Sequence, residues 1–70
     1  MHELAITLKA ARVNAGLTQA EAAERIGVSK EVIGNWERGK TFPKIPNIKK
    51  IEEVYGMTYA DLIFLPTDNG

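Results

Sequence analysis

The side chains that enzymes use for chemistry are sparse in this sequence. It contains one histidine, His2, and no cysteine, too few nitrogen and sulfur ligands for a typical zinc or iron site. It has no glycine-rich phosphate loop and no serine–histidine–acid set. Glu52 and Glu53 are adjacent, so on a helix their side chains diverge by about 100° and do not share a cleft. The sequence therefore predicts a protein that is not an enzyme, with no metal, no other cofactor and no evident small-molecule ligand.

The clearest chemical pattern is a cluster of basic residues in the middle of the chain. The formal net charge of the 70 residues is zero, but residues 30–50 contain six basic and two acidic side chains and carry +4. The remaining residues contain three basic and seven acidic side chains and carry −4. A neutral protein polarised in this way can present a positive face to nucleic acid. The alternative is that these basic side chains are ordinary solvated surface charges.

The length and the composition predict one small domain. Seventy residues without cysteine depend on helix packing for stability, with the possible help of a partner chain. We expect the domain to span residues 1–65, followed by a flexible tail at residues 66–70. No stretch is long and apolar enough to span a bilayer, and Glu3 interrupts any secretion signal, so we expect a cytoplasmic protein without a membrane partner.

Apolar spacing and capping residues predict an all-α chain with no strand. Leu4, Leu8, Ala11 and Ala15 follow one helical stripe. Glycines and N-cap residues then divide the rest of the chain into short helices. The expected helices are approximately residues 3–15, 19–26, 29–38, 47–55 and 58–64.

The segment from Thr18 to Gly39 has the form of a helix-turn-helix. Two short helices are joined by a turn that contains Gly27, where the absence of a Cβ permits a positive φ. Thr18 and Glu21 have capping-box spacing at the start of the first of these helices. Ala23 is small enough for the two helices to cross closely, and Val28 and Ile33 can fill the wedge between them.

This segment and its flanks resemble the Cro/repressor-type (XRE-like) helix-turn-helix family of phage repressors and related bacterial regulators. The residues that carry the resemblance are Arg12, Gly16-Leu17-Thr18-Gln19, Ala23, Gly27-Val28-Ser29, Ile33, Trp36-Glu37-Arg38-Gly39-Lys40 and Pro43. The match covers approximately residues 4–65 and implies a compact five-helix, lambda-repressor-like DNA-binding domain. Ala22 and Glu52 depart from the family pattern, where a larger aliphatic and a small apolar residue are common.

The resemblance implies that Lys30, Glu31 and Asn35 contact bases from a recognition helix at about residues 29–38. Lysine can donate to guanine, glutamate can accept from cytosine, and asparagine can pair with adenine. Glu31 has the alternative of being a surface charge or of stabilising the first turn of its helix. Gly34 lies inside the same helix, where it either permits a close approach or has no special role.

The resemblance also implies that Gln19, Arg38, Lys40 and Lys44 contact phosphates, which fixes the register on DNA without reading its sequence. It further implies that Gln19 braces the recognition helix. Gln19 could instead be a polar residue of a first turn, and Arg38 could stabilise the end of its helix. Lys49 and Lys50 are interpreted as a solvated helix face.

Two further implications concern the scaffold and the assembly. Arg12 and Glu37 are expected to form a partly buried ion pair, with Trp36 in the core. One recognition helix reads few base pairs, so we expect a homodimer, at least on DNA. Its interface is assigned to Tyr59, Phe64 and Leu65. The alternative to an interface in this region is that Leu62 and Ile63 complete the core of one protomer.

The sequence thus predicts a sequence-specific regulator of transcription, a Cro-like repressor of phage or mobile-element type that binds a double-stranded DNA operator. The same pattern fits the DNA-binding part of a longer repressor or an antitoxin. A different class of function is an adaptor that uses this scaffold for protein–protein contact. The net neutrality and Glu31 are compatible with that alternative.

Overall fold

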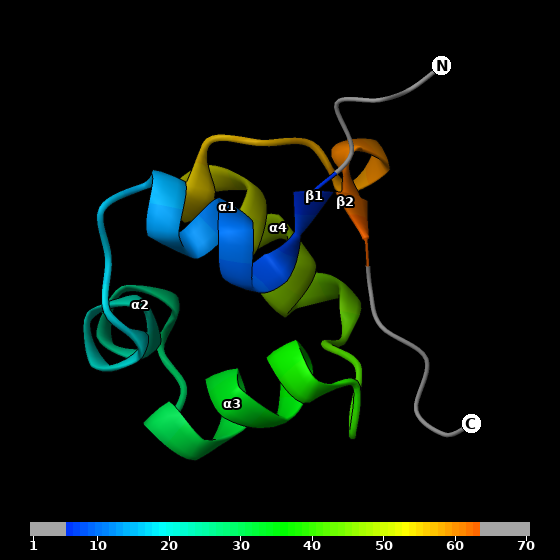
Figure 1. The fold of residues 1–70 in the computed structure, drawn as a ribbon. Helices are drawn as coiled ribbons and strands as arrows, with labels where there is room; N and C mark the ends of the chain where they lie inside the picture. The colour runs from blue at the N-terminus through cyan, green and yellow to red at the C-terminus, as the bar shows by residue number, and fades with distance from the viewer. Residues whose placement is uncertain (1–5, 64–70) are drawn as a thin grey trace.

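Four α-helices carry the fold over residues 6–63, the part of the chain that the computed structural model describes. They are α1 (Leu8–Asn14), α2 (Gln19–Ile26), α3 (Lys30–Arg38) and α4 (Ile45–Tyr55) (Figure 1). A 3-10 turn, η1 (Tyr59–Asp61), follows α4, and two strands of two residues each, β1 (Ile6–Thr7) and β2 (Leu62–Ile63), pair in parallel. The expectation of a mostly helical domain is confirmed, whereas the described residues contain four α-helices rather than five.

The first helix begins later than expected. Thr7 is the N-cap of α1, and its side-chain oxygen accepts a hydrogen bond from the backbone N–H of Ala10 at 3.1 Å. Ile6 lies opposite Leu62 in the strand pair. The prediction of a helix through residues 6 and 7 is therefore wrong, because β-branched Ile6 and Thr7 favour extended backbone and have a strand to pair with. Leu4 lies outside the described residues.

The expected fifth helix is replaced, over its described part, by η1 and β2. The hydroxyl of Thr58 makes no N-cap bond and donates to Oδ2 of Asp61 at 2.9 Å. The backbone N–H of Tyr59 donates to Oε2 of Glu52 at 2.7 Å, which ties the turn to α4. The chain then pairs with β1, so the predictions of a helix at residues 58–63 and of a chain without strands are wrong. Phe64 and the tail at residues 66–70 lie outside the described residues.

The loop after α3 is shorter than expected, because α4 begins at Ile45 and not near residue 47. Lys44 occupies the N-cap position, and Pro46 lies in the first turn. Proline is tolerated there because the backbone N–H groups of a first turn have no acceptor within the helix. Among the described helices, none combines the length and the apolar character needed to cross a membrane.

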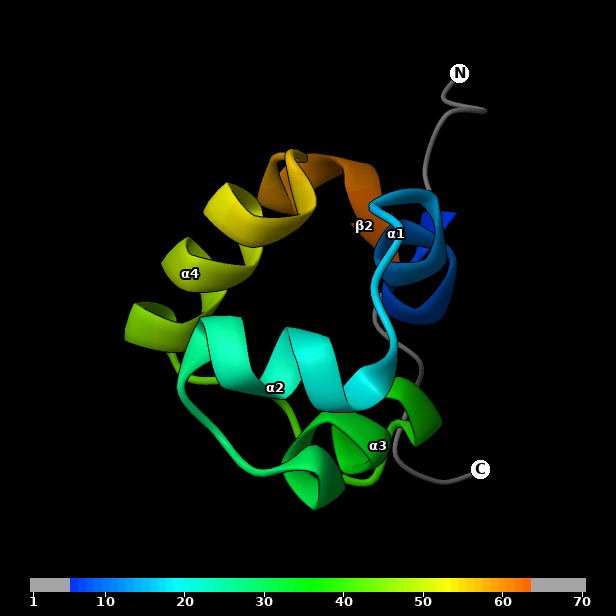
Figure 2. The same ribbon diagram turned by 90° about the vertical axis from the view of Figure 1, so that its left-hand side faces the viewer.

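Side chains from all four helices meet in one core. Figure 2 shows α1, α2 and α4 around this core, with α3 lying below α2 at the edge of the molecule. Ile33 and Ile51 are the largest side chains that are fully buried. The core residues are Leu8, Ala11, Leu17, Ala22, Ala23, Ile26, Ile33, Trp36, Ile51, Tyr55 and Leu62. One face of α3 is thereby fixed against the scaffold, while its opposite face points away from it.

Candidate nucleic-acid interface

The turn between α2 and α3 fixes the angle at which the two helices meet. Gly27 ends α2 with φ 94° and ψ 32°, a left-handed conformation that side chains with a Cβ rarely adopt. Its backbone N–H and that of Val28 donate to the carbonyl oxygen of Ala23, at 2.8 and 3.0 Å. Ala23 is 4% exposed, so a larger side chain there would push the helices apart.

Hydrogen-bonded caps set the first residues of both helices. Oγ1 of Thr18 accepts from the backbone N–H of Glu21 at 3.1 Å, and Oε1 of Glu21 accepts from that of Thr18 at 2.9 Å. Oγ of Ser29 accepts from the backbone N–H of Val32 at 3.2 Å. The predicted capping box and the predicted bounds of both helices are confirmed. Such caps stabilise a helix by about 1 kcal/mol each.

The outward face of α3 is polar and borders a hollow of about 370 Å³. Ile33 and Trp36 are buried on the opposite face, so α3 does not need this polar surface for packing. The hollow brings together residues from both helices of the motif, and several of them were singled out in the sequence. Its lining residues are Gln19, Lys30, Glu31, Gly34 and Arg38.

Arg12 and Glu37 form an ion pair between α1 and α3. Nε of Arg12 donates to Oε2 of Glu37 at 2.6 Å and Nη2 to Oε1 at 3.2 Å, while Nη1 donates to the carbonyl oxygen of Leu17 at 2.9 Å. The two side chains are 9% and 6% exposed. The hydrogen bond with Glu37 raises the pKa of Arg12, and burial opposes that rise. The pair therefore holds the end of α3 against the scaffold.

Gln19 belongs to the same network. Its Nε2 donates to Oε1 of Glu37 at 3.0 Å. A carboxylate only accepts hydrogen bonds, so the amide nitrogen of Gln19 is turned towards Glu37. The resemblance implied that Gln19 braces the recognition helix, but it did not identify Glu37 as the partner or join Gln19 to the ion pair.

Asn35 and Arg38 also form a pair that sequence reasoning missed. Nη2 of Arg38 donates to Oδ1 of Asn35 at 2.7 Å. The i, i+3 spacing of the two residues on a helix is the signal that could have revealed this contact. The residue expected to read bases and the residue expected to hold phosphate are thus in direct contact.

Lys40 and Lys44 are exposed and lie in the segment that joins α3 to α4. Neither lines the hollow on α3. Pro43, between them, is buried and fixes this segment to the protein. The two lysines thus lie between the end of α3 and the start of α4, outside the hollow that Lys30 and Glu31 line.

Tyr59 lies apart from the α3 face and is 52% exposed. With Phe42, Pro43 and Ile48 it lines an apolar hollow of about 300 Å³. Phe64 and Leu65, the other expected interface residues, lie outside the described residues. Leu62 is 8% exposed and belongs to the core of the protomer.

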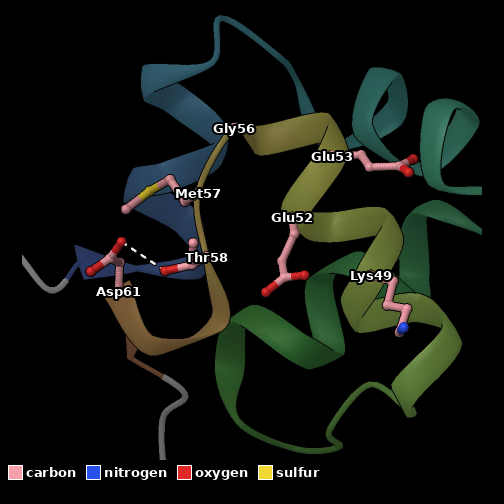
Figure 3. A pocket seen from close by; sticks show the side chains of 7 residues that line it. All are labelled: Lys49, Glu52, Glu53, Gly56, Met57, Thr58 and Asp61. Atoms are coloured by element: carbon pink, nitrogen blue, oxygen red, sulfur yellow. Dashed lines mark hydrogen bonds between the residues drawn. The ribbon is translucent and has the colours of Figure 1, made fainter.

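A third hollow, of about 670 Å³, lies between the end of α4 and η1, and its charged side chains are mostly acidic (Figure 3). Glu52, Glu53 and Asp61 line it together with Lys49. Within the described residues no group of three or more histidine, cysteine or acidic side chains is placed to hold a metal ion. Three acidic side chains against one lysine give this surface a net negative charge, which disfavours a polyanion.

Comparisons with known proteins agree with this geometry. A family model described as helix-turn-helix matches residues 8–62. The chain is 34% identical over 56 residues to the HTH-type transcriptional activator BcrR of Enterococcus faecalis, covering 80% of this chain and 28% of that protein. It is 36% identical over 52 residues to the cryptic phage CTXphi transcriptional repressor RstR of Vibrio cholerae, covering 74% of this chain and 47% of that protein.

A third relative is closer to this chain in length. The chain is 34% identical over 59 residues to an uncharacterized HTH-type transcriptional regulator of Methanothermobacter thermautotrophicus, covering 84% of this chain and 86% of that protein. By contrast, the chain spans less than half the length of the activator and of the repressor. The likeness to those two proteins therefore concerns their helix-turn-helix portions.

Proposed function

This chain belongs to the helix-turn-helix family whose model it matches, and from that premise we propose that it is a sequence-specific regulator of transcription that inserts α3 into the major groove of double-stranded DNA. The observation that carries the proposal is the polar outward face of α3. Lys30, Glu31 and Arg38 are exposed on it, and Gln19 from α2 borders the same hollow. The major groove is wide enough to admit such a helix.

Lys30, Glu31 and Asn35 contact base edges in this proposal. Gln19, Lys40 and Lys44 contact phosphates of the DNA backbone, whose negative charge the two lysines neutralise. The hydrogen bond from Gln19 to Glu37 supports this role, because it fixes the side chain of Gln19 while the second N–H of its amide stays available.

Repression by occlusion of a promoter is the mode of action that we propose, in the manner of Cro-like regulators of phages and mobile elements. One relative is named a phage repressor and another an activator. Occlusion requires only that the domain occupy its site, which suits a helix-turn-helix domain of residues 1–65. The protein would act in the cytoplasm, where its operator DNA is accessible.

A homodimer completes this proposal, because two copies double the number of base pairs read. Their α3 helices would enter half-sites about 34 Å apart. The proposed contact includes Tyr59, Phe64 and Leu65, and the exposed apolar surface beside Tyr59 supports it. Phe42 is 51% exposed there, and Ile45 at the start of α4 is 69% exposed. A second copy would remove this surface from water, which favours association.

Selection of bound duplexes from a random pool by the full chain tests the proposal. The expected result is an enriched motif with two half-sites, bound more weakly as the salt concentration rises. Lys30→Ala should weaken binding to the motif. Lys49→Ala, which removes a lysine from the acidic surface, is the matched control and should leave binding unchanged. Absence of DNA binding at low salt, together with capture of a protein partner, would support the adaptor alternative, which the exposed carboxylate of Glu31 favours.

A further inference from the structure

The side chain of Arg38 folds back along α3 towards the N-terminal half of the helix. Its Nη2 donates to Asn35 one turn earlier, at 2.7 Å. A Cβ placed on Gly34 would lie 3.1 Å from Nη1 of Arg38 and 3.8 Å from its Cζ and Nη2. Long side chains on helices lean in this direction, over the preceding turn. The guanidinium of Arg38 therefore lies across the backbone of Gly34 instead of extending from the end of the helix.

Gly34 makes this position possible. Glycine is the least favourable residue in a helix interior after proline, so it needs a compensating reason there. Any other residue would place its Cβ closer to the guanidinium than ordinary van der Waals contact. Apart from the backbone of the helix itself and the two residues next to Gly34, the three atoms nearest to such a Cβ all belong to Arg38. Because Gly34 has no side chain, the guanidinium of Arg38 has space to lie over this part of the helix.

The folded position changes what Arg38 can contact. Arg38 lines the same hollow as Gln19, Lys30 and Glu31, which contact DNA in the proposed function. A guanidinium has five N–H donors, of which Asn35 takes one. Arg38 is exposed, so its other donors can reach a ligand on this face.

We propose, building on the proposed function, that Arg38 determines specificity by donating two N–H groups to O6 and N7 of a guanine in the major groove. This role replaces the phosphate contact implied by the family resemblance. Paired acceptors on one base edge match the geometry of a guanidinium. Asn35 positions Arg38 through its Oδ1, and in this inference that role replaces the contact to a base edge that the proposed function gives it. Because that oxygen already accepts from Arg38, Asn35 is less suited to receive the N6 donor of adenine.

The test uses the duplex selected by the wild-type protein and fluorescence anisotropy titrations of the full chain. Each G·C pair is replaced in turn by A·T, and each guanine in turn by 7-deazaguanine, which lacks the N7 acceptor. At one position in each half-site, we expect the A·T replacement to weaken wild-type binding by about tenfold. The 7-deazaguanine replacement should weaken binding at the same position.

Arg38→Lys keeps the charge and removes the fork of donors. It should lose about tenfold in affinity for the unmodified duplex, with an unchanged salt dependence. Because a lysine ammonium can still donate to guanine, its sensitivity to both replacements at that position should be reduced, whereas Arg38→Ala should be indifferent to them. Arg25→Lys is the matched control, because Arg25 is an exposed arginine on α2 outside this hollow. It should behave as wild type. Thermal melting of each variant establishes that it is folded.

Two negative results are distinguishable. If Arg38→Ala keeps the base preferences of the wild type at every position, and weakens all duplexes equally with a reduced salt dependence, Arg38 is a phosphate contact. The inference is then overturned while the proposed function stands. If the wild-type protein selects no sequence at all, the proposed function fails and the inference fails with it.

Discussion

Nε of Arg12 lies 2.6 Å from Oε2 of Glu37, and this contact joins α1 to the end of the helix that carries the candidate DNA-binding face. The same carboxylate accepts from Nε2 of Gln19. Three helices thus converge on one buried acid. The position of α3 relative to α2 depends on this acid as well as on apolar packing.

Arg12→Met should lower the free energy of unfolding by about 3–5 kcal/mol, because it leaves the buried carboxylate of Glu37 without its cation. Urea unfolding at neutral pH measures the loss. The double variant Arg12→Met/Glu37→Leu removes both charges and should recover a large part of that stability. A loss below about 1 kcal/mol for Arg12→Met would mean that the pair behaves as a solvent-exposed one.

Tyr55 should make the protein lose stability in alkali. Burial first, and the charge of Glu37 second, raise the pKa of Tyr55 from 10.0 to about 12, although the charge of Arg12 opposes the rise. The folded protein therefore holds the phenol proton more tightly than the unfolded chain. The resulting stability is complete below pH 10 and is lost as the pH rises towards 12, with a slope of up to about 1.4 kcal/mol per pH unit.

Denaturant titrations between pH 8 and about pH 12 check this sign, following the linkage between protonation and unfolding. Tyr55→Phe should flatten the decline in the free energy of unfolding. Tyr59→Phe, which removes the hydroxyl of a half-exposed tyrosine, serves as the matched control. Parallel pH profiles of wild type and Tyr55→Phe would show that the phenol of Tyr55 does not contribute.

The helix-turn-helix itself was predictable because its signals are local. Thr18 with Glu21, Ser29 with Val32, and Gly27 each act within one turn of chain, and the structure has α2 and α3 at the predicted residues. Each capping side chain bonds to a residue three positions along the chain, and at this short sequence separation the residue types predict the start of the helix.

The ends of the domain and the arrangement of the candidate site were not predictable in this way. Pairing of Ile6 with Leu62 joins opposite ends of the described chain and overrides the helical stripe. The bond from Tyr59 to Glu52 depends on how the chain returns after α4. For Arg38, the sequence specified a cation at the end of a helix. The position of its guanidinium over Gly34, beside the hollow, depends on the packing of atoms in three dimensions.

Asn35→Ala should lower the discrimination between DNA sites while leaving the fold intact. Asn35 is partly exposed, and the one side-chain hydrogen bond described for it is to the exposed Arg38, so its truncation removes little from the core. We expect the preference for the selected motif over random duplex to fall, with a loss of about 1–3 kcal/mol of discrimination. Competition titrations measure this ratio. Unchanged selectivity would exclude Asn35 from base recognition, whether direct or through Arg38.

Lys40→Ala should weaken binding to every duplex by a similar factor. Lys40 is exposed just beyond α3 and outside the hollow, so a contact to the DNA backbone is the role that its position supports. Loss of one phosphate contact should reduce the slope of log affinity against log salt concentration by about one. Titrations at four salt concentrations give the slope. If binding to one sequence alone were affected, Lys40 would be a base contact instead.

Gly34→Ala should make the protein more stable and a poorer reader of DNA. Gly34 has a helical backbone, so alanine gains up to about 1 kcal/mol from helix propensity. Its Cβ would lie 3.1 Å from Nη1 of Arg38, whose side chain is exposed and can move aside at little energetic cost. The guanidinium must shift by a few tenths of an ångström, which alters the direction in which its donors point from the helix. We therefore expect a higher melting temperature together with a weaker preference for guanine at the position read by Arg38.

Two comparisons separate this effect from a general one. Gly27→Ala, at φ 94°, should destabilise the protein, because alanine is strained in that conformation. In an Arg38→Ala background, Gly34→Ala should still raise the melting temperature but should no longer alter the base preference, since the side chain that it displaces is absent. If Gly34→Ala changes the base preference equally with and without Arg38, then the methyl group itself contacts the DNA. In that case Gly34 does not act on base preference by leaving space for Arg38.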